Sequence, residues 1–316
     1  MLYFLQKGSG LMTPPSNPIH SLQSDLLHVE INEVGAALHR LYSKKTSTEF
    51  IEEQHYAPVL FPVVGQLKDG KYSYNGKSYQ MPNNGFAANR TFAVSNPLYY
   101  QNCLVFTLED SKETRAMYPF SFALQVVFIV NWNRLEIAYQ VINETKGPMY
   151  FSCGSLEGYT CPRLDNEGLE DYFIEFDNEH DYEVHTHAPG GLLTTTTHPV
   201  IENGKVLPLN YKLFENGSLV FIDIPSGNTV LGSHKSKTRV DLSYDPAPDL
   251  TICAKKDDPV VCIGPSWGMS DFENSSTVNE DSSNLESNDD LTTKPGIILL
   301  EKDGVFTWKR FITIYE

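Results

Sequence analysis

Residues 57–90 read APVLFPVVGQLKDGKYSYNGKSYQMPNNGFAANR, and this stretch decides the fold class. Within it, Lys71 to Met81 alternates apolar and polar side chains around the pair Asn75-Gly76. An Asn-Gly pair between alternating segments is the strongest short-range signal for a β-hairpin, because both turn residues tolerate positive φ. We therefore expect a hairpin here, in a chain that is built from short strands.

The pattern of short strands continues on both sides of this hairpin. Gly, Pro and Asn clusters separate apolar runs at regular intervals, and no segment of ten or more residues has convincing helical periodicity. Regularly spaced short strands without helices predict an all-β fold, here one large antiparallel β-sandwich. Further strands are expected at Leu27–Ile31, Leu104–Leu108, Phe120–Val130, Leu135–Asn143, Tyr172–Phe176, Val260–Ile263 and Phe306–Ile314, among others.

The composition of the chain excludes some classes of partner and indicates a cellular compartment. The 316 residues are 41% hydrophobic and carry a net charge of −16. Such an acidic chain repels phosphate backbones, so we expect no nucleic-acid partner, and it has no apolar run near the ~20 residues that span a bilayer, so we expect no membrane insertion. Its five cysteines are odd in number and have no Cys-x-x-Cys spacing. This favours free thiols in an intracellular, reducing compartment, either cytoplasmic or organellar.

Two segments differ from the rest of the chain. Residues 1–24 are rich in Pro, Ser and Gly and are interpreted as a flexible lead-in to a single domain at 25–316. Residues 273–293 contain no aromatic and no basic residue. A segment of this composition cannot offset its ordering entropy by burial, so we expect a disordered acidic insertion, with contact to a protein partner as the alternative.

Several motifs in the same order resemble one known family. Residues 151–159, FSCGSLEGY, are similar to the family pattern FSxGGHPxF, and residues 213–221, LFENGSLVF, are similar to LFxxDALxF. Residues 261–268, VCIGPSWG, are similar to VCIEPWxG, and the segment at 57–90 is similar to FPxxGRL followed by HGFAR. Each motif is weak alone, but their order resembles the galactose mutarotase-like, or aldose 1-epimerase, family and its LacX-like branch. The resemblance implies a β-sandwich of the supersandwich type with a sugar cleft.

The resemblance also implies which positions would line that cleft. Family members interconvert sugar anomers with a glutamate base and a histidine acid, and they hold the sugar with a second histidine, an arginine and an aspartate. In this sequence those five positions are, in the same order, Gly264, Leu156, Asn84, Gln66 and Gly217. General acid–base help contributes ~10²–10⁴ per group, so the loss of both groups predicts little activity above the spontaneous rate.

Four other residues are candidates for this cleft. Glu157 is a possible relocated base if its segment is a loop, whereas in a regular strand it would face away. Lys68 and Arg90 are candidates for the lost positive charge, and Trp267 for stacking on a sugar ring. The His-x-His pattern at 180–187 is interpreted as a surface hairpin, and no metal site and no cofactor are expected.

These observations predict an aldose 1-epimerase-like protein without catalytic activity that serves as a structural or interaction subunit of a protein assembly. Two alternatives stay open. One is a carbohydrate-binding protein that holds a neutral sugar without turnover, and the other is an active hexose mutarotase with relocated catalytic groups.

Overall fold

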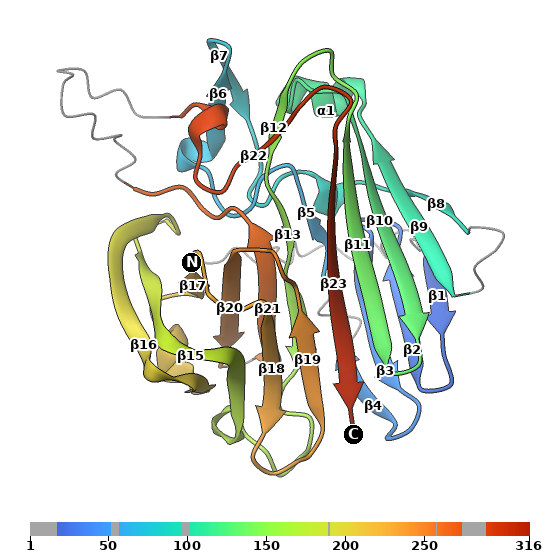
Figure 1. The fold of residues 1–316 in the computed structure, drawn as a ribbon, viewed down its shortest axis with the longest axis vertical. Coiled ribbons are helices and arrows are strands. Elements are labelled where there is room, and N and C mark those ends of the chain that lie inside the picture. Colours follow the sequence, from blue (N-terminus) through green and yellow to red (C-terminus); the bar gives the residue numbers. More distant parts are fainter. Residues whose placement is uncertain (1–17, 52–56, 97–101, 189, 257, 274–288) are drawn as a thin grey trace, which may run out of the picture.

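The computed structural model describes residues 18–51, 57–96, 102–188, 190–256, 258–273 and 289–316. Its largest sheet has nine strands and curves around one side of the molecule (Figure 1). In spatial order these are β16 (Leu193–Pro208), β15 (Tyr172–His187), β18 (Asn228–Ser233), β19 (Arg239–Ser243), β23 (Val305–Tyr315), β11 (Arg134–Asn143), β10 (Phe122–Asn131), β9 (Cys103–Glu109) and β8 (Ala93–Ser95).

A six-stranded sheet faces it and carries the segments that resemble the family motifs. Its strands are β17 (Leu219–Phe221), β20 (Asp249–Lys255), β21 (Asp258–Trp267), β13 (Cys153–Ser155) and β5 (Val59–Leu60), with β14 (Glu157–Thr160) also paired to β21.

Smaller sheets and short helices complete the fold. The four-stranded sheet is β1 (Ile19–Gln23), β2 (Leu27–Asn32), β3 (Ala37–Ser43) and β4 (Thr48–Ile51), and the two-stranded ones are β6 (Lys71–Tyr74) with β7 (Lys77–Gln80) and β12 (Met149–Phe151) with β22 (Ile298–Leu300). The helices are α1 (Lys112–Met117) and the 3₁₀ turns η2 (Lys68–Gly70), η3 (Ala87–Asn89), η4 (Leu169–Asp171), η5 (Tyr211–Phe214) and η6 (Leu291–Thr293).

The predicted all-β class is confirmed: the described strands form antiparallel sheets, and the two large sheets face each other as a sandwich. The hairpin predicted at 71–81 is present as β6 and β7, and Asn75 and Gly76 have φ of 49° and 71°. These positive values are the ones that an Asn-Gly turn accommodates at low steric cost. The short helix α1 was not predicted, because six residues are too few to show the periodicity of an amphipathic helix.

Two predicted boundaries need correction. The flexible lead-in was placed at 1–24, but Ile19–Gln23 forms β1 and pairs with β2 along its whole length; residues 1–17 lie outside the described part. The disordered insertion was placed at 273–293, but Leu291 is fully buried and Asp290 forms a bridge with Ser73. Residues 274–288 of that prediction lie outside the described part.

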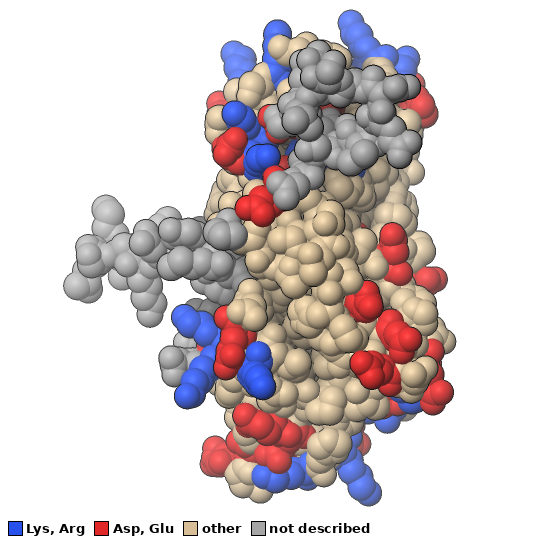
Figure 2. Space-filling view, turned by 90° about the vertical axis from the view of Figure 1, so that its left-hand side faces the viewer, with Lys and Arg blue, Asp and Glu red and all other residues tan. Residues whose placement is uncertain are grey.

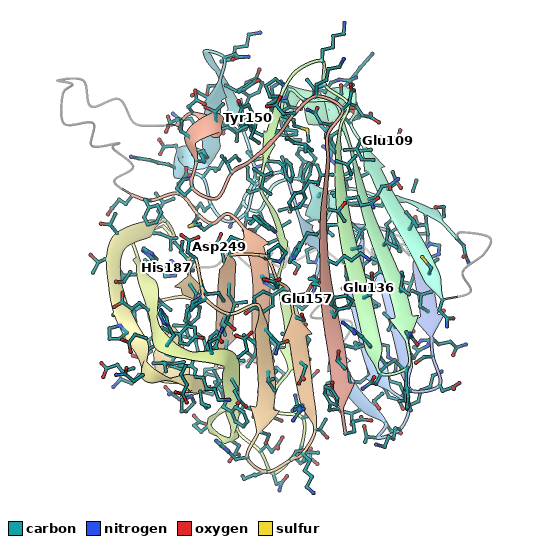
Figure 3. The ribbon with its side chains drawn as sticks, in the orientation of Figure 1. Glu109, Glu136, Tyr150, Glu157, His187 and Asp249 are labelled. Atoms are coloured by element: carbon teal, nitrogen blue, oxygen red, sulfur yellow. The ribbon has the colours of Figure 1, made fainter. Side chains whose placement is uncertain are left out.

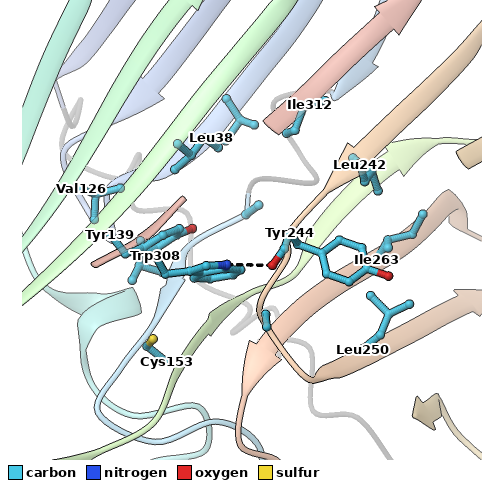
Figure 4. Packing of buried hydrophobic residues seen from close by; sticks show 14 of the residues in the cluster. Leu38, Val126, Tyr139, Cys153, Leu242, Tyr244, Leu250, Ile263, Trp308 and Ile312 are labelled. Carbon is cyan, nitrogen blue, oxygen red and sulfur yellow. Dashed lines mark hydrogen bonds between the residues drawn. The ribbon is translucent and has the colours of Figure 1, made fainter. Parts of the chain in front are cut away.

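The core lies between the two large sheets. Trp308 on β23 is 1% exposed, and its ring stacks on Tyr139 with centroids 5.0 Å apart (Figure 4). Its indole nitrogen donates a hydrogen bond of 2.9 Å to the Tyr244 carbonyl oxygen, which satisfies the one polar atom of a buried ring. This packing anchors the segment after β19 to the inner face of the nine-stranded sheet.

Charge is distributed unevenly over the surface. On the face that carries the β15–β16 hairpin, acidic side chains gather beside a broad central area without charged side chains (Figure 2). Among the described residues no helix is long and apolar enough to cross a membrane.

Candidate functional site

A cavity of about 90 Å³ lies where the six-stranded sheet meets the β15–β16 hairpin. Five positions that are spread over almost two hundred residues of sequence converge on its wall. They are Gln66, Asn84, Leu156, Gly217 and Gly264, the positions that the family resemblance assigned to the sugar cleft. The fold therefore assembles the predicted cleft positions into one place.

Leu156 and Gly264 close the floor of this cavity against each other. A Cβ atom on Gly264 would lie 2.4 Å from the Ser155 carbonyl oxygen and 2.7 Å from Leu156 Cδ1. Real Cβ atoms do not approach other atoms so closely, because packing in protein interiors is already dense. The glycine is thus required where β21 crosses the connection from β13 to β14, and a longer side chain fits only if that connection moves.

We expect Gly264→Ala to lower the free energy of unfolding by about 1–3 kcal/mol, because the new methyl group overpacks the site against backbone atoms. Gly147→Ala is the matched control, since a Cβ there meets nothing within 4 Å, and it should stay within about 0.5 kcal/mol of wild type. Urea denaturation of both variants tests this. Equal stability of the two alanine variants would contradict the close approach.

His187 occupies the space beside Gly217. A Cβ on Gly217, whose φ is +123°, would lie 2.8 Å from His187 Cδ2. The ring is held because its Nε2 donates a hydrogen bond of 2.8 Å to the Ser218 carbonyl oxygen. Among the described residues that form the cavity wall, His187 is the one with an acid–base side chain, and no Asp, Glu, Lys or Arg is present.

The hairpin predicted at 180–187 is present as part of β15 and β16. Its last residue, His187, is half-buried and lines the cavity, which was not predicted (Figure 3). Sequence reasoning missed this residue because strand alternation does not reveal where a long, bulged strand meets another sheet. Elsewhere in the described part, no three His, Cys, Asp or Glu side chains are grouped as a metal ion would require.

Gln66 and Asn84 are fixed by backbone hydrogen bonds at the cavity rim. The Gly65 amide donates to Asn84 Oδ1 at 2.7 Å, and the Gln66 amide donates to Ser270 Oγ at 2.9 Å. Asn84 has a φ of 61°, a left-handed conformation that asparagine tolerates better than most residues. The side-chain oxygen of Asn84 thus supports the loop. The side-chain nitrogen of Asn84 and the side-chain carboxamide of Gln66 are the groups that a ligand could use.

A buried ion pair stabilises the same rim. Lys294 Nζ lies 2.6 Å from Asp271 Oδ2, and the two side chains are 7% and 5% exposed. Asp271 Oδ2 also accepts a hydrogen bond of 2.9 Å from the Lys68 amide. The Lys68 ammonium donates to the Glu273 carbonyl oxygen at 3.1 Å, so this candidate residue lies on the outer rim and is not part of the cavity wall.

Glu157 faces away from the cavity. It begins β14, is 1% exposed, and forms an ion pair with Arg310 and a hydrogen bond of 3.1 Å with Ser155 Oγ. Burial raises the pKa of the Glu157 carboxyl, and the Arg310 guanidinium opposes that rise. In Figure 3 the strands β20 and β21 separate Glu157 from His187. The carboxylate therefore serves the core and cannot reach a ligand in the cavity.

Trp267 and Arg90 also lie outside the cavity wall. The Trp267 ring packs edge-on against Phe306, with centroids 5.6 Å apart, which assigns it to the core boundary. Arg90 follows η3, and its carbonyl oxygen accepts a hydrogen bond of 2.8 Å from the Gly35 amide. Of the nine predicted cleft positions, the structure thus brings five together and leaves Lys68, Arg90, Glu157 and Trp267 elsewhere.

Asp249 stands behind the cavity and was not anticipated. It is 2% exposed and pairs in register with Ser266, a residue of the cavity wall. Its carboxylate accepts hydrogen bonds from the Gly268 amide at 2.9 Å and the Asp223 amide at 3.3 Å. Burial raises the pKa of Asp249 to about 6, because the desolvation of the charge outweighs these two donors.

The five cysteines are free and buried. Burial raises the pKa of Cys153 and that of Cys161, the latter to about 12, so both thiols are protonated at neutral pH. They are packing residues, and the cellular compartment stays a prediction.

Comparison with known proteins gives one consistent result. The family model of aldose 1-epimerase matches residues 18–278. Protein LacX of Lactococcus lactis subsp. lactis is 26% identical over 265 residues, which cover 79% of this chain and 87% of LacX. The crystal structure of a galactose mutarotase related enzyme from Lactobacillus acidophilus has a TM-score of 0.83 at 27% identity and covers 95% of this chain and 98% of that one.

A second crystal structure shares the fold at lower identity. A galactose mutarotase-like protein from Lactobacillus casei superimposes with a TM-score of 0.82 at 21% identity, over 94% of this chain and all of the other. The family match covers most of the sequence, and its solved relatives have the same sandwich. The chain belongs to the aldose 1-epimerase family.

Proposed function

We propose that this protein is a non-catalytic member of its family that serves as a structural or interaction subunit of a protein assembly. One observation carries the proposal: the positions of the family base and acid hold Gly264 and Leu156, and these two residues are packed together. Mutarotation needs a group that takes the proton of the anomeric hydroxyl and another that protonates the ring oxygen. A single imidazole, His187, cannot supply both at once.

The small volume of the cavity also supports a non-catalytic role. Pockets that enclose small-molecule ligands usually measure about 300–1,000 Å³, well above the 90 Å³ found here. For contact with a partner, the exposed ring of Trp132 between β10 and β11 is a suitable anchor: it is 68% exposed, and aromatic side chains dominate the energetics of protein interfaces.

Polarimetry tests the absence of turnover. Freshly dissolved α-glucose or α-galactose should relax at the buffer rate in the presence of the purified protein, while an active mutarotase in the same buffer accelerates it. Relaxation faster than buffer, in proportion to protein concentration, would refute the proposal and favour the active hexose mutarotase.

Binding of a neutral sugar without turnover is the second candidate. The observation that favours it is the chemistry of the cavity wall, where Gln66, Asn84 and Thr251 offer neutral amide and hydroxyl groups. Calorimetric titration with glucose and galactose distinguishes the candidates. A heat of binding that Gln66→Ala removes and the control Gln80→Ala, on the exposed strand β7, retains would favour the sugar.

A further inference from the structure

The strand β16 forms one edge of the nine-stranded sheet. Among the described strands of this sheet β15 is its one neighbour, so the other side of β16 pairs with none of them. Residues 195–199 of β16 are all exposed. A strand with one covered face would alternate between buried and exposed side chains, so this stretch is uncovered on both of its faces.

This edge is also free of charged side chains. Residues 192–201 contain no Asp, Glu, Lys or Arg, although 20% of the chain is charged. Natural proteins commonly protect an exposed edge strand with charged residues, Lys above all. One carboxylate borders the stretch: Glu183 lies opposite Pro199 on β15 and accepts a hydrogen bond of 2.7 Å from Thr197 Oγ1. In Figure 2 the hairpin lies on the face whose broad central area has no charged side chains, with acidic side chains beside it.

A bulge shapes the middle of this stretch. The pairing of β16 with β15 shifts register, and residues 194–196 lie opposite the single residue Thr186. The Thr196 amide donates a hydrogen bond of 3.2 Å to Thr194 Oγ1, which holds the bulge in its own shape. Extra residues of a bulge are left out of the ladder, and Pro199 has no amide hydrogen to donate. A second chain at this edge would therefore be held by side chains and not by a continued backbone ladder.

From this placement we propose that the threonine segment, residues 194–197, lies at the centre of a two-fold interface with a second copy of this chain. Two copies that each carry a net charge of −16 repel through their acidic surfaces, so they approach best where carboxylates are absent. A hydroxyl group both donates and accepts, so threonines that meet across a two-fold axis can pair with their own copies. A basic partner would instead select the acidic side chains beside the segment. The proposal rests on the interaction role proposed above and names one partner for it.

Sedimentation velocity at micromolar protein concentration, in buffers of low and high ionic strength, tests this interface. We expect a species of twice the 35.6 kDa of one chain, and its fraction should increase with salt, because salt screens the repulsion between two acidic chains. A complex held by opposite charges would weaken with salt instead. A protein that is monomeric in both buffers, or a dimer that dissociates as salt is added, would overturn the proposal.

A matched pair of variants locates the interface. Thr196→Glu should weaken the dimer about tenfold or more, because it brings two carboxylates together near the axis. Ser78→Glu, on the exposed strand β7, adds the same charge elsewhere and should leave the dimer unchanged. Thermal melting checks that both variants are folded. Equal dimerisation of the two variants would show that the threonine segment is not at the interface.

The outcome is separable from that of the proposed function. A monomer that leaves anomer relaxation at the buffer rate would refute the second copy as partner and leave the non-catalytic role standing. A salt-strengthened dimer that accelerates relaxation would refute the non-catalytic role and leave the interface standing.

Discussion

Arg310→Met is expected to lower the free energy of unfolding by about 3–5 kcal/mol, because it leaves a buried carboxylate without its counter-charge. The two side chains of the Arg310–Glu157 pair are 4% and 1% exposed. The guanidinium also donates to Tyr139 Oη from Nε at 3.2 Å and from Nη2 at 3.1 Å, so the substitution removes several charge-assisted bonds at once. Urea denaturation at pH 7 measures the loss.

The neighbouring residue provides a control. Lys309 lies on the same strand and pairs with Glu136, but it is 57% exposed, so Lys309→Met should cost less than about 1 kcal/mol. Replacing both buried partners, as in Glu157→Leu with Arg310→Met, should recover most of the stability, because no unpaired charge remains. If Arg310→Met lowers the free energy of unfolding no more than Lys309→Met does, the Glu157 carboxylate is not held in the core by Arg310. The alternative in which Glu157 acts as a relocated base would then have to be considered again.

The second large effect is a loss of stability with rising pH that originates at Asp249. Its pKa is raised from 3.8 to about 6 in the folded protein. Between these values the folded state holds a proton that the unfolded state has released, so the stabilisation is complete below about pH 4 and is lost as the pH rises through 6. A shift of this size corresponds to about 3 kcal/mol.

Comparison with Asp249→Asn isolates this contribution from the other carboxylates. The free energy of unfolding of the variant, relative to wild type, should increase by about 3 kcal/mol between pH 4 and pH 7, because the amide does not titrate. Asp303→Asn, at a position whose side chain is 78% exposed, should give a profile parallel to wild type. A parallel profile for Asp249→Asn as well would show that the carboxylate titrates normally.

The sequence was sufficient for the fold class and for the positions of the cleft. Alternation around Asn75-Gly76 specified the hairpin, because the side-chain period of a strand and the backbone of its turn are local properties. The order of the motifs specified which positions would meet, and Gln66, Asn84, Leu156, Gly217 and Gly264 do meet in one cavity. Alternation also indicated that Glu157 would face away if it lay in a strand, as it does.

The remaining features depend on contacts between distant segments. Nothing local to His187 indicates that its ring fills the space beside Gly217, and nothing local to Asp249 indicates that it is buried next to the Gly268 amide. The acidic composition of 273–293 gave no sign that Leu291 is buried, because its burial depends on contacts with distant segments.

Magnetisation-transfer NMR of the two anomers of glucose at equilibrium tests the central claim most directly. The claim is that the cleft of this family member no longer holds a proton donor and a proton acceptor that face a sugar. It predicts that the anomer-exchange rate with saturating protein equals that of buffer, for wild type and for His187→Gln alike. An exchange rate that rises with wild-type protein and returns to the buffer value in His187→Gln would contradict it, because an imidazole in the cavity wall would then be transferring protons.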